Sequence, residues 1–188
     1  STRGVDSVHM LSIASLQVST AHILAHNART AHNAPTKEVS PMDVVLLFLL
    51  LITGFVGCAE FASVALVHPV IRSLPLEHQM TMEKGLLRTF GRVMPVGMTA
   101  APILAGTAAV SRGGGWLPAS AVVLSIALLV TIVGNVPINR WTGRLRGTEV
   151  PPRFREIRRR WDIFQAARGS LQLLGFVLVA IGICTSTA

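Results

Sequence analysis

The sequence predicts an all-α integral membrane protein, a four-helix bundle with an amphipathic helix between its third and fourth spans. Three observations support this fold class. The 188 residues are 51% hydrophobic and 14% charged, with a mean hydropathy of +0.55, whereas about a quarter of the residues of a soluble domain are charged. Four apolar runs approach or exceed the length of about 20 residues that spans a bilayer. None alternates between polar and apolar residues as strands do, so helices are the expected spanning elements.

The predicted spans cover residues 44–67, 93–110, 116–137 and 169–185. The first and third are continuous apolar runs, and Glu60 is the only charged residue of the first. The second is shorter and contains two prolines and two glycines, and the fourth is short unless the residues that follow extend it. Residues 42–188 are therefore expected to form one transmembrane domain.

Charged residues between the spans predict the orientation of this domain. The segments joining the first span to the second and the third to the fourth hold thirteen Lys and Arg residues, and the rest of the chain holds four. Under the positive-inside rule, the face with thirteen charges is cytoplasmic. Both termini are therefore expected outside, with the protein in a bacterial plasma membrane.

Residues 1–41 differ in composition from the rest and are expected to form a polar arm. His22 and His26 stand four residues apart, which places two imidazoles on one face of a helix, and His32 follows. A copper or zinc site is one interpretation of this pattern. Solvated histidines are the favoured one, because no cysteine or carboxylate stands among them.

The segment before the fourth span predicts an amphipathic helix. Its apolar and aromatic residues recur at spacings of three and four, and residues 158–160, all arginine, fall largely off that face. Pro151 and Pro152 favour a helix start just before it. We expect a cytoplasmic interfacial helix that runs on into the fourth span. Its face consists of Phe154, Ile157, Trp161, Phe164 and Arg168.

Two titratable residues of the first helix are candidates for chemistry. A carboxylate at membrane depth, such as Glu60, is expected to have a function and a partner; a glutamate that only ties helices together is the alternative. His68 follows eight residues later, at about 80° of rotation and about 12 Å of rise on an α-helix. The two side chains are expected to face one bundle interior from different depths. An interfacial histidine at the helix end is the other interpretation of His68.

Two arginines begin predicted spans. Arg168 falls on the apolar face of its helix, so it should point into the bundle, where Glu60 is the expected partner. Arg92 either snorkels toward the lipid headgroups or takes part in binding.

Two asparagines end the third span. Asn135 and Asn139 are one helical turn apart around a proline, and they either cap free carbonyls or face Glu60 and Arg168. All these polar residues, with Trp161, fall in the cytoplasmic half of the spans. The sequence therefore predicts one polar chamber in that half.

Composition also limits the remaining functions. The formal net charge of +8 is concentrated between the spans, as expected for flanks of membrane helices. No zinc-knuckle, RNA-binding or helix-turn-helix pattern is present, so nucleic acid is not an expected partner. Cys58 and Cys184 lie in apolar runs and are expected to be small buried fillers.

Three stretches together resemble the anthrone oxygenase-like family of small four-span membrane proteins. They are GLLRTFGRVMP at the second span, NVPIN at the end of the third, and the Trp, Phe and Arg of RWDIFQAARGSLQLLGF. Their order and spacing match over about residues 43–185. The family's Asn-x-Pro-x-Asn element falls on Asn135, Pro137 and Asn139, and its tryptophan and arginine on Trp161 and Arg168. The family commonly has an asparagine shortly before that arginine, where this chain has Gln165.

The resemblance implies the oxidation of an anthrone to an anthraquinone by molecular oxygen. On this interpretation, His68 or Glu60 removes a proton from a lipophilic aromatic or polyketide-type substrate. Asn135, Asn139 and Arg168 then stabilise the enolate oxygen. This mechanism requires no cofactor, and copper or iron bound by His68 and Glu60 is the alternative.

A non-catalytic function is the second class of hypothesis. The chain would then be a membrane subunit, or a protein that binds a small molecule or lipid, acting as a homo-oligomer or with a partner. Proline and glycine in the second span permit the close helix approach that such assembly uses.

Overall fold

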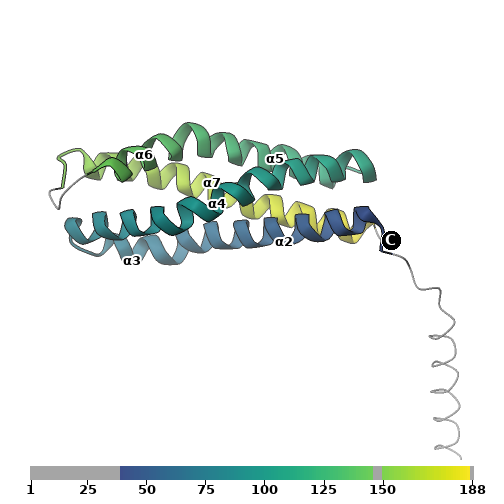
Figure 1. Cartoon of the computed structure of the whole chain (residues 1–188), viewed down its shortest axis with the longest axis horizontal. Helices are drawn as coiled ribbons and strands as arrows, with labels where there is room; N and C mark the ends of the chain where they lie inside the picture. Colours follow the sequence, from purple (N-terminus) through teal and green to yellow (C-terminus); the bar gives the residue numbers. More distant parts are fainter. Residues whose placement is uncertain (1–38, 146–149, 187–188) are drawn as a thin grey trace, which may run out of the picture. The chain divides into compact units, whose positions relative to one another are not determined.

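The computed structural model describes residues 39–145 and 150–186, whose regular secondary structure is all helical (Figure 1). The chain divides between Val39 and Ser40 into two units, and the helical bundle is the second of them. The expectations for the N-terminal arm and its histidines lie outside the described residues. The helices are α2 (Pro41–Ala62), η1 (Ser63–Val67), α3 (His68–Arg72), α4 (Leu76–Arg112), α5 (Trp116–Val130), η2 (Thr131–Asn135), α6 (Val136–Arg144) and α7 (Phe154–Ser186).

These segments join into four long rods, which confirms the predicted four-helix fold. Each rod is long and apolar enough to cross a membrane. Successive rods run up and down the bundle, and α2 and α5 each contact both α4 and α7. The rods are Pro41–Arg72, Leu76–Arg112, Trp116–Arg144 and Phe154–Ser186.

The rods extend beyond the predicted spans, mainly where the chain passes from α3 to α4 and from α6 to α7. We call this end of the bundle the basic end. There α4 begins at Leu76 rather than near residue 93, and α7 begins at Phe154 rather than near residue 169. Hydropathy did not mark these extensions because they carry many charged residues, yet their inward faces are buried at Phe154 and Trp161. The expected interfacial helix is thus the first half of α7 and packs inside the bundle.

The outside of the bundle is apolar and much of its inside is built from small residues. Large side chains such as Phe48, Val96 and Ile132 are exposed, whereas three alanines of α4 are fully buried. Small residues let helices approach closely where lipid supplies no hydrophobic force between them. Cys58 and Cys184 are exposed, so the expectation of buried fillers is wrong. An apolar run gives no sign of which face turns outward, because both sides are apolar. The alanines are Ala101, Ala105 and Ala108.

The opposite end of the bundle is closed by local caps. Ser40 and Asp43 form a capping box at the start of α2, and Asp43 also pairs with Arg112 of α4 at 2.6 Å. Gly113 and Gly114 then turn the chain with φ values of 68° and 77°, a backbone region that glycine favours.

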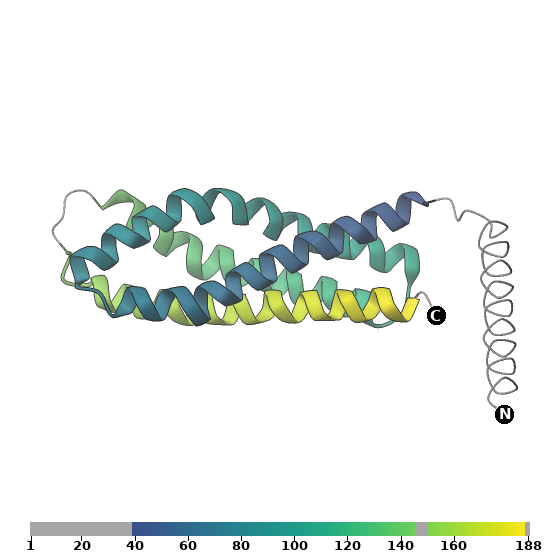
Figure 2. The same cartoon turned by 90° about the horizontal axis from the view of Figure 1, so that it is seen from below.

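Gly57 allows α2 and α7 to cross at close range, in the crossing that Figure 2 shows. A Cβ on Gly57 would lie 2.9 Å from the backbone oxygen of Gln172, closer than a side chain tolerates. Nearer the start of α7, a Cβ on Gly169 would lie 3.3 Å from the backbone oxygen of Glu60. The crossing therefore brings Glu60 directly onto the first half of α7.

We expect Gly57→Ala to lower the free energy of unfolding by about 1–3 kcal/mol, because the added methyl group must push two backbones apart. Gly106→Ala is the matched control, since a Cβ on Gly106 meets nothing within 4 Å. It should raise helix stability by about 0.5–1 kcal/mol. Unfolding in mixed micelles, followed by circular dichroism, measures both. Equal stabilities would contradict the close crossing.

Candidate functional site

A pocket of about 340 Å³ lies between the four rods, in the half of the bundle nearer the basic end. Its wall on α4 is largely apolar apart from Glu83, and the wall formed by the other rods is largely polar. The volume lies at the lower end of the range of small-molecule sites. The apolar side chains of α4 are Leu86, Leu87, Phe90, Met94 and Met98; the polar wall of the other rods includes Glu60, Ser63, His68, Thr131, Asn139, Arg140, Trp161, Gln165 and Arg168.

A π-helical turn brings the two titratable residues of the first rod into register. In η1 the N–H of His68 bonds to the oxygen of Ser63, five residues back. Pro69 follows, and proline lacks an N–H and crowds the preceding turn, which favours such a bulge. The extra residue reduces the rotation between Glu60 and His68 from the expected 80° or so to about 20°. Both side chains therefore line one pocket, and η2 precedes Pro137 in the same way.

Glu60 is the centre of a buried polar network. Its Oε2 accepts hydrogen bonds from Arg168 Nη2 and from Gln165 Nε2, each at 2.6 Å. Gln165 Oε1 accepts from Arg168 and, at 3.3 Å, from Asn135 Nδ2. The side chains of Glu60 and Arg168 are only 1% and 9% exposed, so bulk water screens this pair little. The predicted pairing of Glu60 with Arg168 is confirmed.

Each residue of the central ion pair has one buried polar atom without a hydrogen-bond partner among the described residues. These atoms are Glu60 Oε1 and Arg168 Nε. Both residues line the pocket. Buried polar atoms of native proteins nearly always have a partner, from the protein or from elsewhere. The inner end of the pocket is therefore suited to receive a polar group of a ligand.

His68 is held from several sides at the pocket wall nearer the basic end. Its Nδ1 lies 3.5 Å from Glu83 Oε1, and its ring centroid lies 4.6 Å from that of Trp161. Arg158 Nη2 lies 2.5 Å from the same Glu83 oxygen, and its guanidinium lies over the Trp161 ring at 4.0 Å. Trp161 Nε1 in turn donates to Asn139 Oδ1 at 2.7 Å. Residues of α4, α6 and α7 thus fix the imidazole of α3.

The two asparagines of the third rod both form hydrogen bonds with α7. Asn135 bonds to Gln165, and Asn139 bonds to Trp161. Asn135 is fully buried behind Gln165, and Asn139 lines the pocket. The approach depends on Gly134, because a Cβ there would overlap the ring of Phe164. The amides therefore join helices rather than cap free carbonyls, and within residues 39–145 and 150–186 the link from Asn135 to the Glu60 network runs through Gln165.

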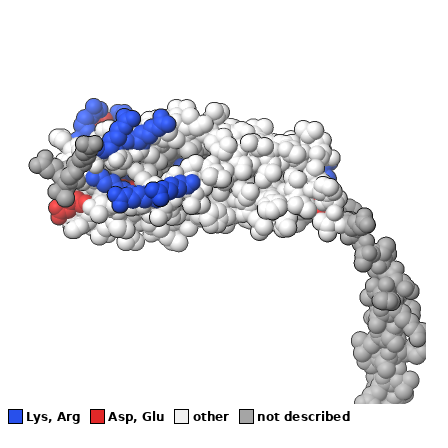
Figure 3. Space-filling view, in the orientation of Figure 1, with Lys and Arg blue, Asp and Glu red and all other residues white. Residues whose placement is uncertain are grey.

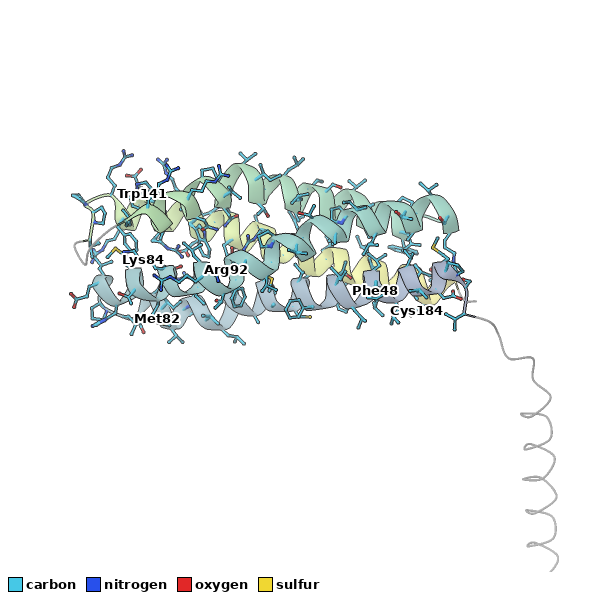
Figure 4. All side chains as sticks on the ribbon, viewed as in Figure 1. Phe48, Met82, Lys84, Arg92, Trp141 and Cys184 are labelled. Carbon is cyan, nitrogen blue, oxygen red and sulfur yellow. The ribbon has the colours of Figure 1, made fainter. Side chains whose placement is uncertain are left out.

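Five of the seven predicted site residues line the pocket. Asn135 supports its wall from behind. Arg92 is exposed on α4 (Figure 4) and is not a lining residue, so its part in binding stays a prediction. The five are Glu60, His68, Asn139, Trp161 and Arg168.

Arg140, which lines the pocket, and two nearly buried charged residues, Glu83 and Arg158, were not identified from the sequence. Glu83 falls in a polar segment predicted to lie between spans, and Arg158 belongs to the arginine cluster placed off the apolar face. Both side chains are nearly buried, at 6% and 11% exposure. The sequence did contain one signal for Glu83: it recurs with apolar residues at spacings of three and four, which places it on the inward face of a helix. The residues of that face are Met80, Glu83, Leu87, Phe90 and Met94, all buried or lining the pocket.

The described side chains are poorly arranged to bind copper or iron, the alternative that involves His68 and Glu60. Within residues 39–145 and 150–186, no group of three or more His, Cys, Asp or Glu side chains is placed to hold a metal ion. His68 and Glu60, the ligands of that alternative, are engaged by Glu83 and by Arg168. A cationic guanidinium beside a ligand carboxylate opposes the binding of a metal cation.

The chain matches a known family of proteins over about half of its length. The family model described as anthrone oxygenase matches residues 80–178, which run from the start of α4 through most of α7. The match includes Glu83, Asn139, Trp161 and Arg168, whereas Glu60 and His68 precede it. Neither the curated proteins nor the solved structures provide a match. Because the model matches more than half of its length, the chain belongs to the anthrone oxygenase family, and its four apolar rods make it a multi-pass membrane protein.

Proposed function

We propose that the protein is a membrane-embedded oxygenase that oxidises an activated CH₂ group of a lipophilic aromatic molecule, with His68 as general base. One observation carries the proposal: an imidazole in contact with a buried carboxylate lines the same pocket of about 340 Å³ as the apolar side chains of α4. An aromatic carbon acid matches both walls. A base within reach of its acidic carbon supplies the chemistry.

His68 is a better candidate for the base than Glu60. Glu60 Oε2 accepts hydrogen bonds from Arg168 and Gln165, so its carboxylate is already bound in an ion pair at the centre of the network. Glu83 contacts Nδ1 of His68, so Nε2 is the nitrogen left to receive the substrate proton.

The proposed reaction balances with molecular oxygen as the oxidant. His68 removes one proton from the CH₂ group, and the resulting enolate transfers electrons to oxygen as a carbon–oxygen bond forms. The peroxide takes back the proton as a C–OOH group, which loses water to leave a carbonyl. One oxygen atom enters the product and the other leaves as water, so no external reductant is needed.

Two donors of the pocket wall are suited to stabilise the enolate oxygen. Arg168 Nε has no other hydrogen-bond partner among the described residues. The amide group of Asn139 keeps its N–H donors because its oxygen is the atom that accepts from Trp161. Preorganised donors of this kind lower the energy of a developing oxyanion. Asn135 acts through Gln165 and is a positioning residue.

Oxygen-dependent turnover in a bilayer tests the proposal. Purified protein in nanodiscs is mixed with anthrone under ¹⁸O₂, and we expect anthraquinone to form faster than in protein-free nanodiscs, with one ¹⁸O atom in the new carbonyl. A rate equal to that of protein-free nanodiscs would contradict the proposed activity. It would favour the alternative of a non-catalytic membrane subunit or binding protein, alone or as a homo-oligomer.

A further inference from the structure

The pocket is open on one side, between α4 and α6. The lining residues at this side, Gly91 and Pro95 of α4 and Arg140 and Gly143 of α6, are all exposed. A Cβ on Gly143 would meet nothing within 4 Å, and one on Gly91 would touch only Leu87, at 3.9 Å. The two glycines thus leave open space at the rim. We call this opening the portal.

Arginines flank the portal on both helices. Arg88 and Arg92 precede Gly91 and Pro95 by three residues each, so they are neighbours of the rim on α4. Arg140 lines the pocket, and Arg144 follows it one turn later on α6. Figure 3 shows Lys and Arg side chains in two groups, over α4 and over α6, on either side of a hollow.

These four arginines lack carboxylate partners within the described part of the chain. Each of its six carboxylates lies within 4.0 Å of a basic side chain other than these four. The portal therefore carries uncompensated positive charge beside the apolar wall of the pocket. The carboxylates are Asp43, Glu60, Glu77, Glu83, Glu156 and Asp162.

The interior indicates which part of a ligand lies where. Phe90, Met94 and Met98 offer an apolar wall to a hydrocarbon or aromatic body. Burial of an anion against such a wall is costly, so a charged group belongs at the rim, where guanidinium groups can bind it with paired hydrogen bonds. At the inner end, Arg168 Nε is unpartnered among the described residues while its residue is only 7% exposed, which independently points to a ligand.

We propose that the pocket binds an amphiphilic anion, a molecule with an apolar, ring-sized body and one carboxylate or comparable anionic group. The body enters sideways through the portal, and Arg140, assisted by Arg88, holds the anionic group at the rim. This inference names the substrate class of the oxygenase and rests on the proposed function only in calling the ligand a substrate. An anionic phospholipid has the same chemistry and is the other source of such a ligand.

Two matched probes test the charge preference. Full-length protein in phosphatidylcholine nanodiscs is titrated with 9-anthracenecarboxylate or with the neutral 9-anthracenemethanol, and quenching of tryptophan fluorescence reports binding near Trp161. Protein-free nanodiscs correct for partition into lipid. We expect the carboxylate to bind about tenfold more tightly than the alcohol, as a charge-assisted hydrogen bond provides. Arg140→Gln should remove this preference and leave the affinity for the alcohol unchanged.

Two further variants separate the portal from general surface charge. Arg159→Gln removes an exposed arginine of α7 that has no carboxylate within 4.0 Å among the described residues and does not line the pocket; it should keep the full preference. Gly143→Leu places a side chain on the rim and should slow the association of both probes. Equal affinities of the two probes for the unmodified protein, or an equal loss in Arg140→Gln and Arg159→Gln, would overturn the inference.

Lipid composition distinguishes the two sources of the anion. If phosphatidylglycerol added to the nanodiscs abolishes binding of the carboxylate but Arg140→Gln relieves that competition, the anion site stands and its occupant is a headgroup. If the carboxylate still binds, a lipophilic acid is the ligand. Charge-selective binding without oxygen-dependent turnover would refute the proposed function alone, whereas turnover without charge selectivity would refute this inference alone.

Discussion

Replacement of His68 by glutamine should lower oxygen-dependent turnover by a factor of about 10²–10⁴, the range associated with a general base. Glutamine keeps a polar side chain beside Glu83 but cannot accept the substrate proton. Affinity for the substrate should change little, because the apolar wall of α4 is untouched. Oxygen consumption in nanodiscs, measured over a range of anthrone concentrations, separates the effect on kcat from that on KM.

His78→Gln is the matched control for this experiment. His78 is an exposed histidine of α4 that lies 3.7 Å from Glu77 and does not line the pocket, so its replacement should leave turnover unchanged. Full activity of His68→Gln would contradict the assignment of the base. In that case Glu60→Gln becomes the decisive variant, since Glu60 is the other titratable residue considered for this role.

Replacement of Arg168 by methionine should lower the free energy of unfolding by about 3–5 kcal/mol, the cost of removing one partner of a buried ion pair. The change leaves the carboxylate of Glu60 in an environment where it is only 1% exposed. It also removes the hydrogen bond that Arg168 donates to Gln165. Equilibrium unfolding in mixed micelles measures the loss.

The double variant Glu60→Gln/Arg168→Met tests whether the unpaired charge causes this loss. An uncharged glutamine is much less costly to bury than a carboxylate, so the double variant should recover most of the stability. Arg159→Met provides the control for a change of arginine to methionine at an exposed position and should cost less than about 0.5 kcal/mol. A single Arg168→Met variant as stable as the original protein would show that the pair contributes nothing.

Much of the membrane domain was predictable because its signals are local. The number and order of the spans follow from runs of apolar residues, and the transfer of such runs into a bilayer depends on composition rather than on tertiary contacts. The boundaries were less predictable at the basic end. There α4 and α7 continue through charged residues that are paired or buried inside the bundle, which hydropathy does not register.

The central ion pair was also predictable, for a different reason. A buried charge requires an opposite charge. Glu60 is the only charged residue of the first predicted span, and Arg168 falls on the apolar face of the helix that runs into the fourth. The two were therefore natural partners, and their side chains meet at 2.6 Å. Glu83 and Arg158 were not predictable in this way, because the polar segments that contain them offer many alternative partners.

The sequence by itself determined the fold class, the four spans and the pairing of Glu60 with Arg168, because apolar length and the cost of a buried charge act wherever these residues occur. Only the tertiary structure decided which side chains share the pocket wall. That choice depends on how far each helix is rotated and how closely it approaches its neighbours. The π-helical turn before His68 and the close crossing at Gly57 set both quantities for Glu60 and His68. The crossing depends on contacts between residues far apart in the chain. The π-helical turn, although Pro69 favours it, adds a residue that a rotation calculated for a regular α-helix does not include.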